Sequence, residues 1–339
     1  SVNSFSLVEK FSDKLNILHF NIRSFNCNFD EFSVFLSRLL FTVDVLVLSE
    51  TWFSTDNIFN IPGYNAFHTH RGDRRGGGIS IYVDEKFGST AISTMSFLSN
   101  TFECCSARLH IEDKYLDIIG IYRPPANLDV NFCSDFENRV LSSLSPSSIS
   151  VITGDFNIDL INPSGVEQDF MNLMYTFACY CIIDKPTRET AASSNLLDHI
   201  WINKDINYNS SVVETYITDH YVVHLALSFP KKCDVFQKAF RDHSGSSIEA
   251  LITEVPAFVS NYRDLIFDSI NDKTDYFVKG VYDLYDDCCP LRCKSLPRVK
   301  LMKPWLTKDL CILFKAKHIL FNKYKRGTVE FSVYNKYKN

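Results

Sequence analysis

Runs of apolar residues that end in polar ones predict a chain rich in β-strands with polar tips. Two stretches show the pattern: 15–21 leads to Asn21, and 149–157 leads to Asp155 and Asn157. Short apolar runs bounded by turn signals are typical of buried strands. Because side chains alternate along a strand, we expect Asp155 and Asn157 on the same side of the chain.

Further strands are expected along the first two thirds of the chain. The pattern places them at 43–52, 102–111, 114–123, 196–203 and 221–229, and a basic, glycine-rich loop enters another strand within 71–83. Polar residues again stand at or beside their ends: Glu50, Tyr122, Asp198, Asp219 and His220. A scaffold that brings several such tips together forms a rigid polar cleft.

Apolar residues at helical spacing predict helices between these strands. The intervals 29–40, 131–144 and 168–180 carry this spacing, and Asp30 is placed to cap the first of them. Strands with helices between them predict a layered α/β fold.

The character of the chain changes after Phe229. Residues 230–290 have a mixed, mainly helical pattern, and 300–326 form an amphipathic basic helix that starts near Pro304 and Thr307. We therefore predict two parts, a strand-rich domain over 1–229 and a helical, C-terminally basic segment over 230–339.

The net charge of −5 hides an asymmetry between these parts. From Arg292 to Asn339 there are thirteen Lys or Arg residues against Asp309 and Glu330, so the preceding residues carry −16. An acidic body with a basic tail indicates that the tail contacts a polyanion.

Composition narrows the class of protein. With 339 residues, 45% hydrophobic and 22% charged, the chain can bury a large core as globular proteins do. No apolar run reaches the roughly 18 residues that cross a bilayer, so we expect no membrane partner. The eleven cysteines are odd in number and follow no secretory signal, which predicts reduced thiols in an intracellular protein.

The polar strand tips match the needs of phosphodiester hydrolysis. Hard cations such as Mg²⁺ take carboxylate oxygens, a role that suits Glu50. Asp155 with Asn157 suits the alignment of a water molecule. His220 can donate a hydrogen bond to the scissile phosphate, and Asp198 can fix its tautomer.

Six motifs in a fixed order carry a family resemblance: "HFNIRS", "LSETW", "GIYRPP", "TGDFN", "LLDHIW" and "TDH". Together they resemble the endonuclease/exonuclease/phosphatase superfamily and, within it, the apurinic-like endonuclease of non-LTR (LINE-type) retrotransposons. The resemblance spans residues 14–229. It implies a two-sheet α/β sandwich flanked by helices, with its site at the sheet ends. It also implies a metal-dependent endonuclease that nicks double-stranded DNA.

The resemblance implies a metal site at the strand tips. Glu50 would be the principal ligand, with Asn21 and Asp219 close to the metal. The implied ion is Mg²⁺, for which Mn²⁺ can substitute.

It also implies a role for each remaining catalytic candidate. Tyr122 would contact the phosphate, Asp155 would activate or orient the water, and Asn157 would hold the transition-state phosphoryl group. Asp198 and His220 would form the orienting dyad.

The sequence departs from many apurinic endonucleases at two places. Arg23 stands where they carry an acid, and Pro125 stands where they carry Asn. Nicking of ordinary duplex DNA is therefore favoured over cleavage at abasic sites. The candidates for contact with DNA are Arg23, Arg71, Arg74, Arg75, Arg123, Thr187, Arg188 and Ser194.

The tail extends the resemblance. "KPWLTKDL", 303–310, resembles the segment that joins endonuclease to reverse transcriptase in these elements. It implies the front part of a longer polyprotein that acts in the nucleus, where the nick leaves a 3′ hydroxyl to prime reverse transcription. Two alternatives stay open. One is another phosphoesterase of the superfamily, an apurinic-site nuclease or a small-ester phosphatase, and the other is a decayed copy that binds DNA without cutting.

Overall fold

The computed structural model describes residues 14–39, 41–72, 74–111, 113–125, 130–190, 193–229, 237–295, 307–325 and 327–336. The chain divides into two compact units, residues 1–231 with 300–339 and residues 232–299. The division at residue 229 that composition favours stays a prediction.

The first sheet brings Asn21 and Glu50 to one edge. Its strand order is β14 (Tyr208–Val213), β15 (Val222–Leu227), β1 (Leu15–Asn21), β2 (Val45–Ser49), β4 (Ile79–Asp84) and β3 (Tyr64–Thr69). Strands β1 and β2 are parallel and pair Asn21 with Ser49. Glu50 therefore leaves the sheet directly beside the tip of β1.

The second sheet aligns three more site candidates. Its strand order is β10 (Tyr180–Cys181), β13 (Asp198–Ile202), β9 (Ile149–Asp155), β8 (Lys114–Tyr122), β7 (Glu103–Ile111) and β5 (Gly88–Ala91), and β6 (Phe97–Leu98) also pairs with β7. Parallel pairing sets Tyr122 beside Asp155, and antiparallel pairing sets Asp155 beside Asp198. The register alone therefore places these three residues in a row.

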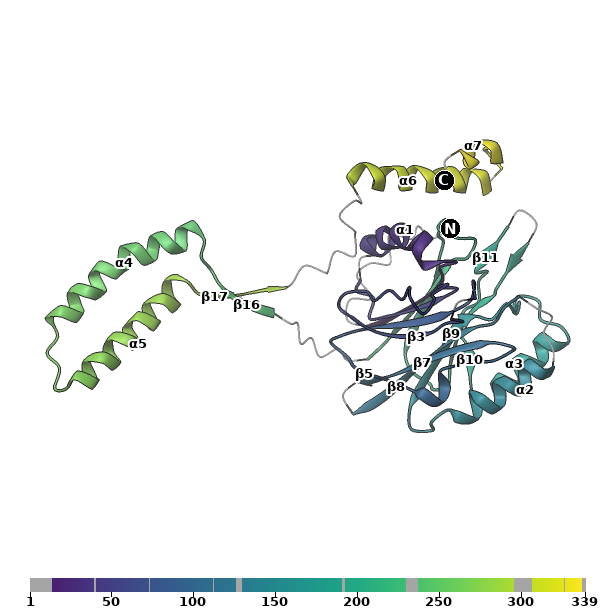
Figure 1. Ribbon diagram of the computed structural model, residues 1–339, viewed down its shortest axis with the longest axis horizontal. Helices are drawn as coiled ribbons and strands as arrows, with labels where there is room; N and C mark the ends of the chain where they lie inside the picture. The colour runs from purple at the N-terminus through teal and green to yellow at the C-terminus, as the bar shows by residue number, and fades with distance from the viewer. Residues whose placement is uncertain are drawn as a thin grey trace. The chain divides into compact units, whose positions relative to one another are not determined.

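The two sheets pack face to face, with helices on their outer faces. Apolar side chains from both sheets, such as Ile17, Val47, Ile118 and Val151, form the core between them. Helix α1 (Phe25–Arg38) packs on the first sheet, and α2 (Val130–Arg139) and α3 (Val166–Thr176) pack on the second (Figure 1). This arrangement confirms the predicted two-sheet α/β sandwich.

Helix α1 begins earlier than expected. It starts at Phe25, after Ser24, and so the prediction that Asp30 caps a helix over 29–40 is wrong. The polar residues after Phe25 conceal the start in the sequence, because they lie on the outer side of the helix. The rings of Phe25 and Phe29 stack 4.3 Å apart, and Phe32 continues this buried stripe at helical spacing.

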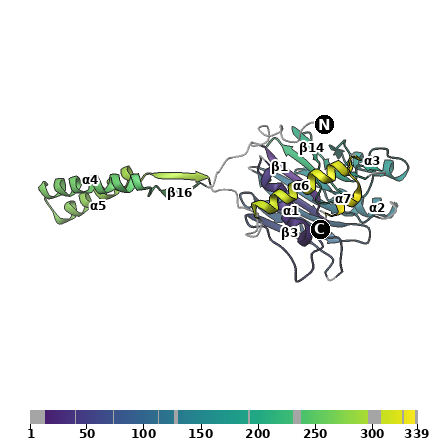
Figure 2. The ribbon, with the colours of Figure 1, turned by 90° about the horizontal axis from the view of Figure 1, so that it is seen from above.

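The last helices belong to the first unit. Helix α6 (Lys308–Lys325) follows Thr307, whose hydroxyl accepts a hydrogen bond from the Leu310 amide at 3.3 Å, and α7 (Phe331–Asn335) comes after it. Lys317 Nζ pairs with Glu31 Oε1 of α1 at 2.6 Å, and Figure 2 shows α6 over α1. The expected start of this helix near Pro304 lies outside the described residues.

The second unit is a helical hairpin. Helices α4 (Gly245–Asp264) and α5 (Ile270–Cys288) pack together, and β16 (Gln237–Arg241) pairs with β17 (Leu291–Ser295) at their base. The mainly helical pattern expected for 230–290 is confirmed where the residues are described. Among the described residues of both units, no helix has the length and apolar character needed to cross a membrane.

Gly154 is the position where a side chain would disturb both fold and site. It pairs with Ile121 between β9 and β8, and a Cβ there would run into the carbonyl group of Ile121. We expect Gly154→Ala to lower the free energy of unfolding by about 1–3 kcal/mol through overpacking. Urea unfolding followed by tryptophan fluorescence measures the change.

The control for this experiment is Gly88→Ala on the edge strand β5. A Cβ there has its nearest neighbour at an ordinary 3.8 Å, on His110. We expect its free energy of unfolding to change by less than about 1 kcal/mol. Equal losses in the two variants would contradict the close approach at Gly154.

Candidate active site

One buried amide joins the tips of the two sheets. Asn21 closes β1 with its side chain fully buried. Its Nδ2 donates to Glu50 Oε1 at 3.0 Å and to Asp155 Oδ2 at 2.8 Å. Glu50 follows a strand of the first sheet and Asp155 ends a strand of the second, so this amide holds one carboxylate from each sheet.

The chain turns sharply as it leaves β2. Glu50 and Trp52 both lie in the left-handed region, with φ of 53° and 56°, where non-glycine residues are uncommon. Backbone of this kind concentrates at functional sites. The turn brings Trp52 Nε1 to 3.1 Å from Glu50 Oε2, to which it donates. Sequence reasoning missed Trp52 as a positioning residue, although it lies within the "LSETW" motif.

Asp155 is held on both carboxylate oxygens. Besides the bond from Asn21, its Oδ1 accepts from the backbone amide of Asn157 at 3.1 Å. Burial raises the pKa of Asp155 to about 7, so this carboxylate can take up a proton near neutral pH. Asn157 lies in the left-handed region, and its side-chain amide donates to the carbonyl of Arg123 at 2.7 Å.

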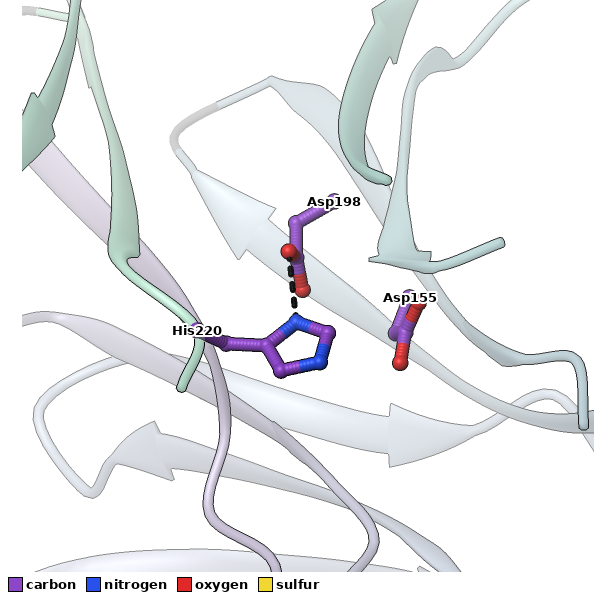
Figure 3. A group of neighbouring side chains, drawn as sticks. All are labelled: Asp155, Asp198 and His220. Atoms are coloured by element: carbon purple, nitrogen blue, oxygen red, sulfur yellow. Dashed lines mark hydrogen bonds and ion pairs between the residues drawn. The ribbon is translucent and has the colours of Figure 1, made fainter. Parts of the chain in front are cut away.

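Asp198 and His220 form the expected pair. His220 Nδ1 bonds Asp198 Oδ2 at 2.9 Å, and Figure 3 shows the other ring nitrogen turned toward Asp155. Atoms of all three side chains lie within 4.8 Å of one another. Burial lowers the pKa of His220, but the carboxylates of Asp198 and Asp155 outweigh it and raise the pKa to about 9. The imidazole is therefore charged at neutral pH.

A second histidine lies behind this pair. His19 Nε2 bonds Ser49 Oγ at 3.1 Å, and its Nδ1 faces Asp198 Oδ1 at 3.7 Å, beyond hydrogen-bond length. Burial lowers the pKa of His19 to about 4, which keeps its ring neutral. Sequence reasoning gave His19 no role. Its place two residues before Asn21, on the same face of β1, was the available signal.

Tyr122 offers a protonated hydroxyl to the site. Its side chain is 5% exposed at the end of β8. Burial raises its pKa, and the charges of Glu50 and Asp155 act in the same direction. A neutral phenol donates hydrogen bonds, which is the property that a phosphate contact needs.

Asp219 serves as an anchor for two arginines. Its Oδ1 accepts from Arg23 Nη1 at 2.9 Å, and its Oδ2 accepts from Arg188 Nε and Nη2 at 2.9 and 2.6 Å. Burial raises the pKa of Asp219, but His220 and the two guanidinium groups outweigh it and lower the pKa. Both oxygens are engaged, so the place of Asp219 beside a metal stays a prediction.

Two candidates for DNA contact are buried and support the site from inside. Arg123 is 2% exposed, and its Nη1 donates to the carbonyls of Phe156 and Asn157 at 3.2 Å each. The Thr187 hydroxyl accepts from the amides of Leu197 and Asp198 at 3.0 and 2.9 Å. Arg123 holds the loop that carries Asn157, and Thr187 holds the start of β13 at Asp198. Their contact with DNA stays a prediction.

The other candidates lie nearer the surface. Arg23, Arg74, Arg75 and Ser194 are exposed, whereas Arg71 and Arg188 are half-buried in ion pairs with Glu103 and Asp219. Arg188 belongs to β11 (Arg188–Glu189), which pairs with β12 (Ser194–Asn195). Two of the exposed arginines adjoin residues of the site: Arg23 pairs with Asp219, and Arg75 lies over the ring of Trp52.

The acidic centre fits a hard divalent cation. Glu50 and Asp155 present carboxylate oxygens around one shared amide. Such oxygens are the ligands that Mg²⁺ takes, together with water and substrate phosphate. Both oxygens of Asp219 are paired with arginines, whereas Asp198 pairs with His220 through Oδ2 alone and its buried Oδ1 accepts no hydrogen bond from the described residues.

Comparison with known proteins identifies the family. The model of the endonuclease/exonuclease/phosphatase family matches residues 18–220. This chain belongs to that family. Its members are metal-dependent phosphodiester hydrolases. A search of curated proteins finds no match by sequence.

Solved structures share the fold. The endonuclease domain of TRAS1, a telomere-specific non-LTR retrotransposon, is 12% identical with a TM-score of 0.52, covering 64% of this chain and all of that domain. The AP endonuclease LMAP from Leishmania major is also 12% identical with a TM-score of 0.52, covering 65% of this chain and 89% of its own. At this identity the likeness establishes the sandwich fold alone.

The raised pKa of His220 makes stability depend on pH. The pKa of His220 is about 9 in the folded protein and 6.5 in its ordinary state. The protonated imidazole therefore stabilises the folded protein fully below pH 6.5, and this stabilisation is lost as the pH rises to 9. We expect the destabilisation caused by His220→Gln to shrink by about 2–3 kcal/mol over this range. Urea unfolding in EDTA, which keeps cations out of the site, measures it.

The matched control is His110→Gln, at an exposed histidine of β7. Its cost, measured over the same pH range, is the baseline with which the change at His220 is compared. A cost of His220→Gln that does not vary with pH would contradict the charged state of this imidazole.

Proposed function

We propose that this protein is a Mg²⁺-dependent DNA endonuclease that hydrolyses one phosphodiester of a duplex. The observation that carries the proposal is the convergence of Glu50, Asn21 and Asp155 from both sheets beside the Asp198–His220 pair. Exposed arginines beside two different residues of the site, Asp219 and Trp52, favour a long polyanion over a small ester. The similarity of the fold to a retrotransposon endonuclease domain supports the same conclusion.

In this proposal Asp155 is the general base that activates the nucleophilic water. Its raised pKa lets the carboxylate accept a proton from a water molecule as the water oxygen attacks phosphorus. The bonds from Asn21 and the Asn157 backbone fix the direction of its lone pairs. The bond between phosphorus and O3′ then breaks, and O3′ takes up a proton from solvent water, which leaves a 5′ phosphate and a 3′ hydroxyl.

The positive and neutral donors stabilise the charge that develops on the phosphoryl group. His220 is held by Asp198 and donates through its remaining ring nitrogen. Tyr122 donates its protonated hydroxyl, and we assign Asn157 the same task through its amide. Glu50, with Asn21 beside it, would hold the cation, which supplies Lewis-acid stabilisation of the phosphate oxygens when bound.

We further propose the biological setting that the sequence resemblance implies. The nick would be made in the nucleus, and its 3′ hydroxyl would prime reverse transcription of a non-LTR retrotransposon. Residues 230–339 would then be the helical, basic linker toward a reverse transcriptase domain of the same polyprotein. The "KPWLTKDL" motif supports this assignment.

Incubation with supercoiled plasmid tests the proposal. We expect relaxed circles in Mg²⁺ and none in EDTA. Asp155→Asn and His220→Gln should each slow nicking about 10²–10⁴-fold, because each removes a proton-transfer or charge-stabilising group. The control is Lys114→Ala. Lys114 begins β8 and Tyr122 ends it, so this variant should nick at the wild-type rate.

The metal ligand is tested in the same assay. Glu50→Gln should shift the Mg²⁺ dependence to higher concentration and be partly rescued by Mn²⁺. If the protein releases phosphate from a small ester but produces no relaxed circles, it is a phosphatase and the proposed endonuclease function is wrong. Binding of duplex DNA without either reaction would identify a decayed copy.

A further inference from the structure

A basic cavity adjoins the active site on the side of Trp52 and Tyr122. It has a volume of about 440 Å³ and is lined by Arg71, Arg74, Arg75, Glu103 and Pro124. The three arginines come from the glycine-rich loop before β4. Three guanidinium groups face one carboxylate among these lining residues, so the cavity carries a net positive charge.

Arg71 builds the wall of this cavity. Its guanidinium pairs with Glu103, whose other oxygen accepts from the backbone amide of Gly78 at 2.5 Å. Gly77 has a φ of 68°, and a Cβ there would run into both Arg71 and Glu103. The glycines of the loop therefore make room for this ion pair, which neutralises Arg71.

Arg74 and Arg75 remain to carry the positive charge. Arg75 lies over the ring of Trp52, at 5.1 Å from its centroid, and Trp52 donates to Glu50. The guanidinium of Arg71 lies 5.8 Å from the ring centroid of Tyr122. Two cavity arginines thus contact Trp52 and Tyr122, which belong to the active site. An extended ligand can therefore occupy the cavity and the active site together.

We propose that this cavity binds a non-scissile phosphate of the DNA strand, with Arg74 and Arg75 as its ligands. Guanidinium groups recognise phosphate through paired hydrogen bonds. Beside Asp219, by contrast, Arg23 and Arg188 already share one carboxylate. Arg74 forms no ion pair among the described residues, and its attraction to Glu103 involves no hydrogen bond, so its guanidinium is less engaged than those of Arg23 and Arg188. The inference rests on the proposed endonuclease function and adds a defined subsite to it.

The salt dependence of DNA binding tests the subsite. Binding of a fluorescent duplex oligonucleotide is measured by anisotropy in EDTA, over a range of salt concentrations. Each lost phosphate contact lowers the slope of log K against log salt by about 0.9 and weakens binding about fivefold at 0.15 M salt. We expect this change in the Arg74→Ala/Arg75→Ala double variant.

The matched control is Lys114→Ala/Lys204→Ala, which also removes two positive charges. Lys114 begins β8, and Lys204 follows β13, so both lie at the ends of their strands opposite the site. We expect its slope to equal that of the wild type. The urea midpoints of both double variants verify that they fold.

Plasmid nicking separates the outcomes. We expect the Arg74→Ala/Arg75→Ala variant to raise KM and leave kcat within twofold, as for a contact made equally in ground and transition states. An unchanged salt slope in a wild-type-like nuclease would overturn the subsite and keep the endonuclease. A wild-type protein that neither binds nor nicks the duplex would overturn the endonuclease itself.

Discussion

The side-chain amide of Asn21 is the interaction on which the site depends. Two carboxylates placed together without a cation or donor repel each other and resist ionisation. The two N–H groups of Asn21 satisfy one oxygen of Glu50 and one of Asp155, at 3.0 and 2.8 Å. Since these acids come from different sheets, the same bonds align the sheets at their tips. Close packing of the sandwich core then keeps this alignment rigid.

Electrostatics explains how an acidic centre can meet an acidic substrate. Buried His220 is kept charged by the carboxylates around it, and Asp219 is neutralised by Arg23 and Arg188. Glu103 forms its ion pair with Arg71 and attracts Arg74 without a hydrogen bond, so one carboxylate faces three guanidinium groups among the described cavity residues. The net result is a small anionic centre, suited to a cation, with positive charge beside it that the proposed binding of a DNA backbone requires.

The sequence was informative wherever strand register decides position. Polar residues at the ends of apolar runs identified Asn21, Asp155 and Asp198, because hydrogen-bonded strands bring their ends together. It was less informative where loops decide. The turn after β2 that presents Trp52 to Glu50 depends on left-handed backbone, and no pattern of apolar residues reports it.

The sequence pattern also could not predict which polar side chains are buried. Arg123 reads as a surface cation, yet it lies under the loop of Asn157 and donates to that loop's carbonyls. Thr187 lies in a loop segment, yet its hydroxyl satisfies two backbone amides next to Asp198. Which polar group ends inside depends on donors and acceptors that converge from distant segments.

The coupling between Asn21 and Asp155 tests the account most directly. Single-turnover nicking of supercoiled plasmid is measured for Asn21→Ala, Asp155→Ala and the double variant. If the two residues act as one unit, the double variant will nick as fast as the less active of the two single variants. Losses that multiply in the double variant would show that the two sheets' tips act independently, and would contradict the shared centre.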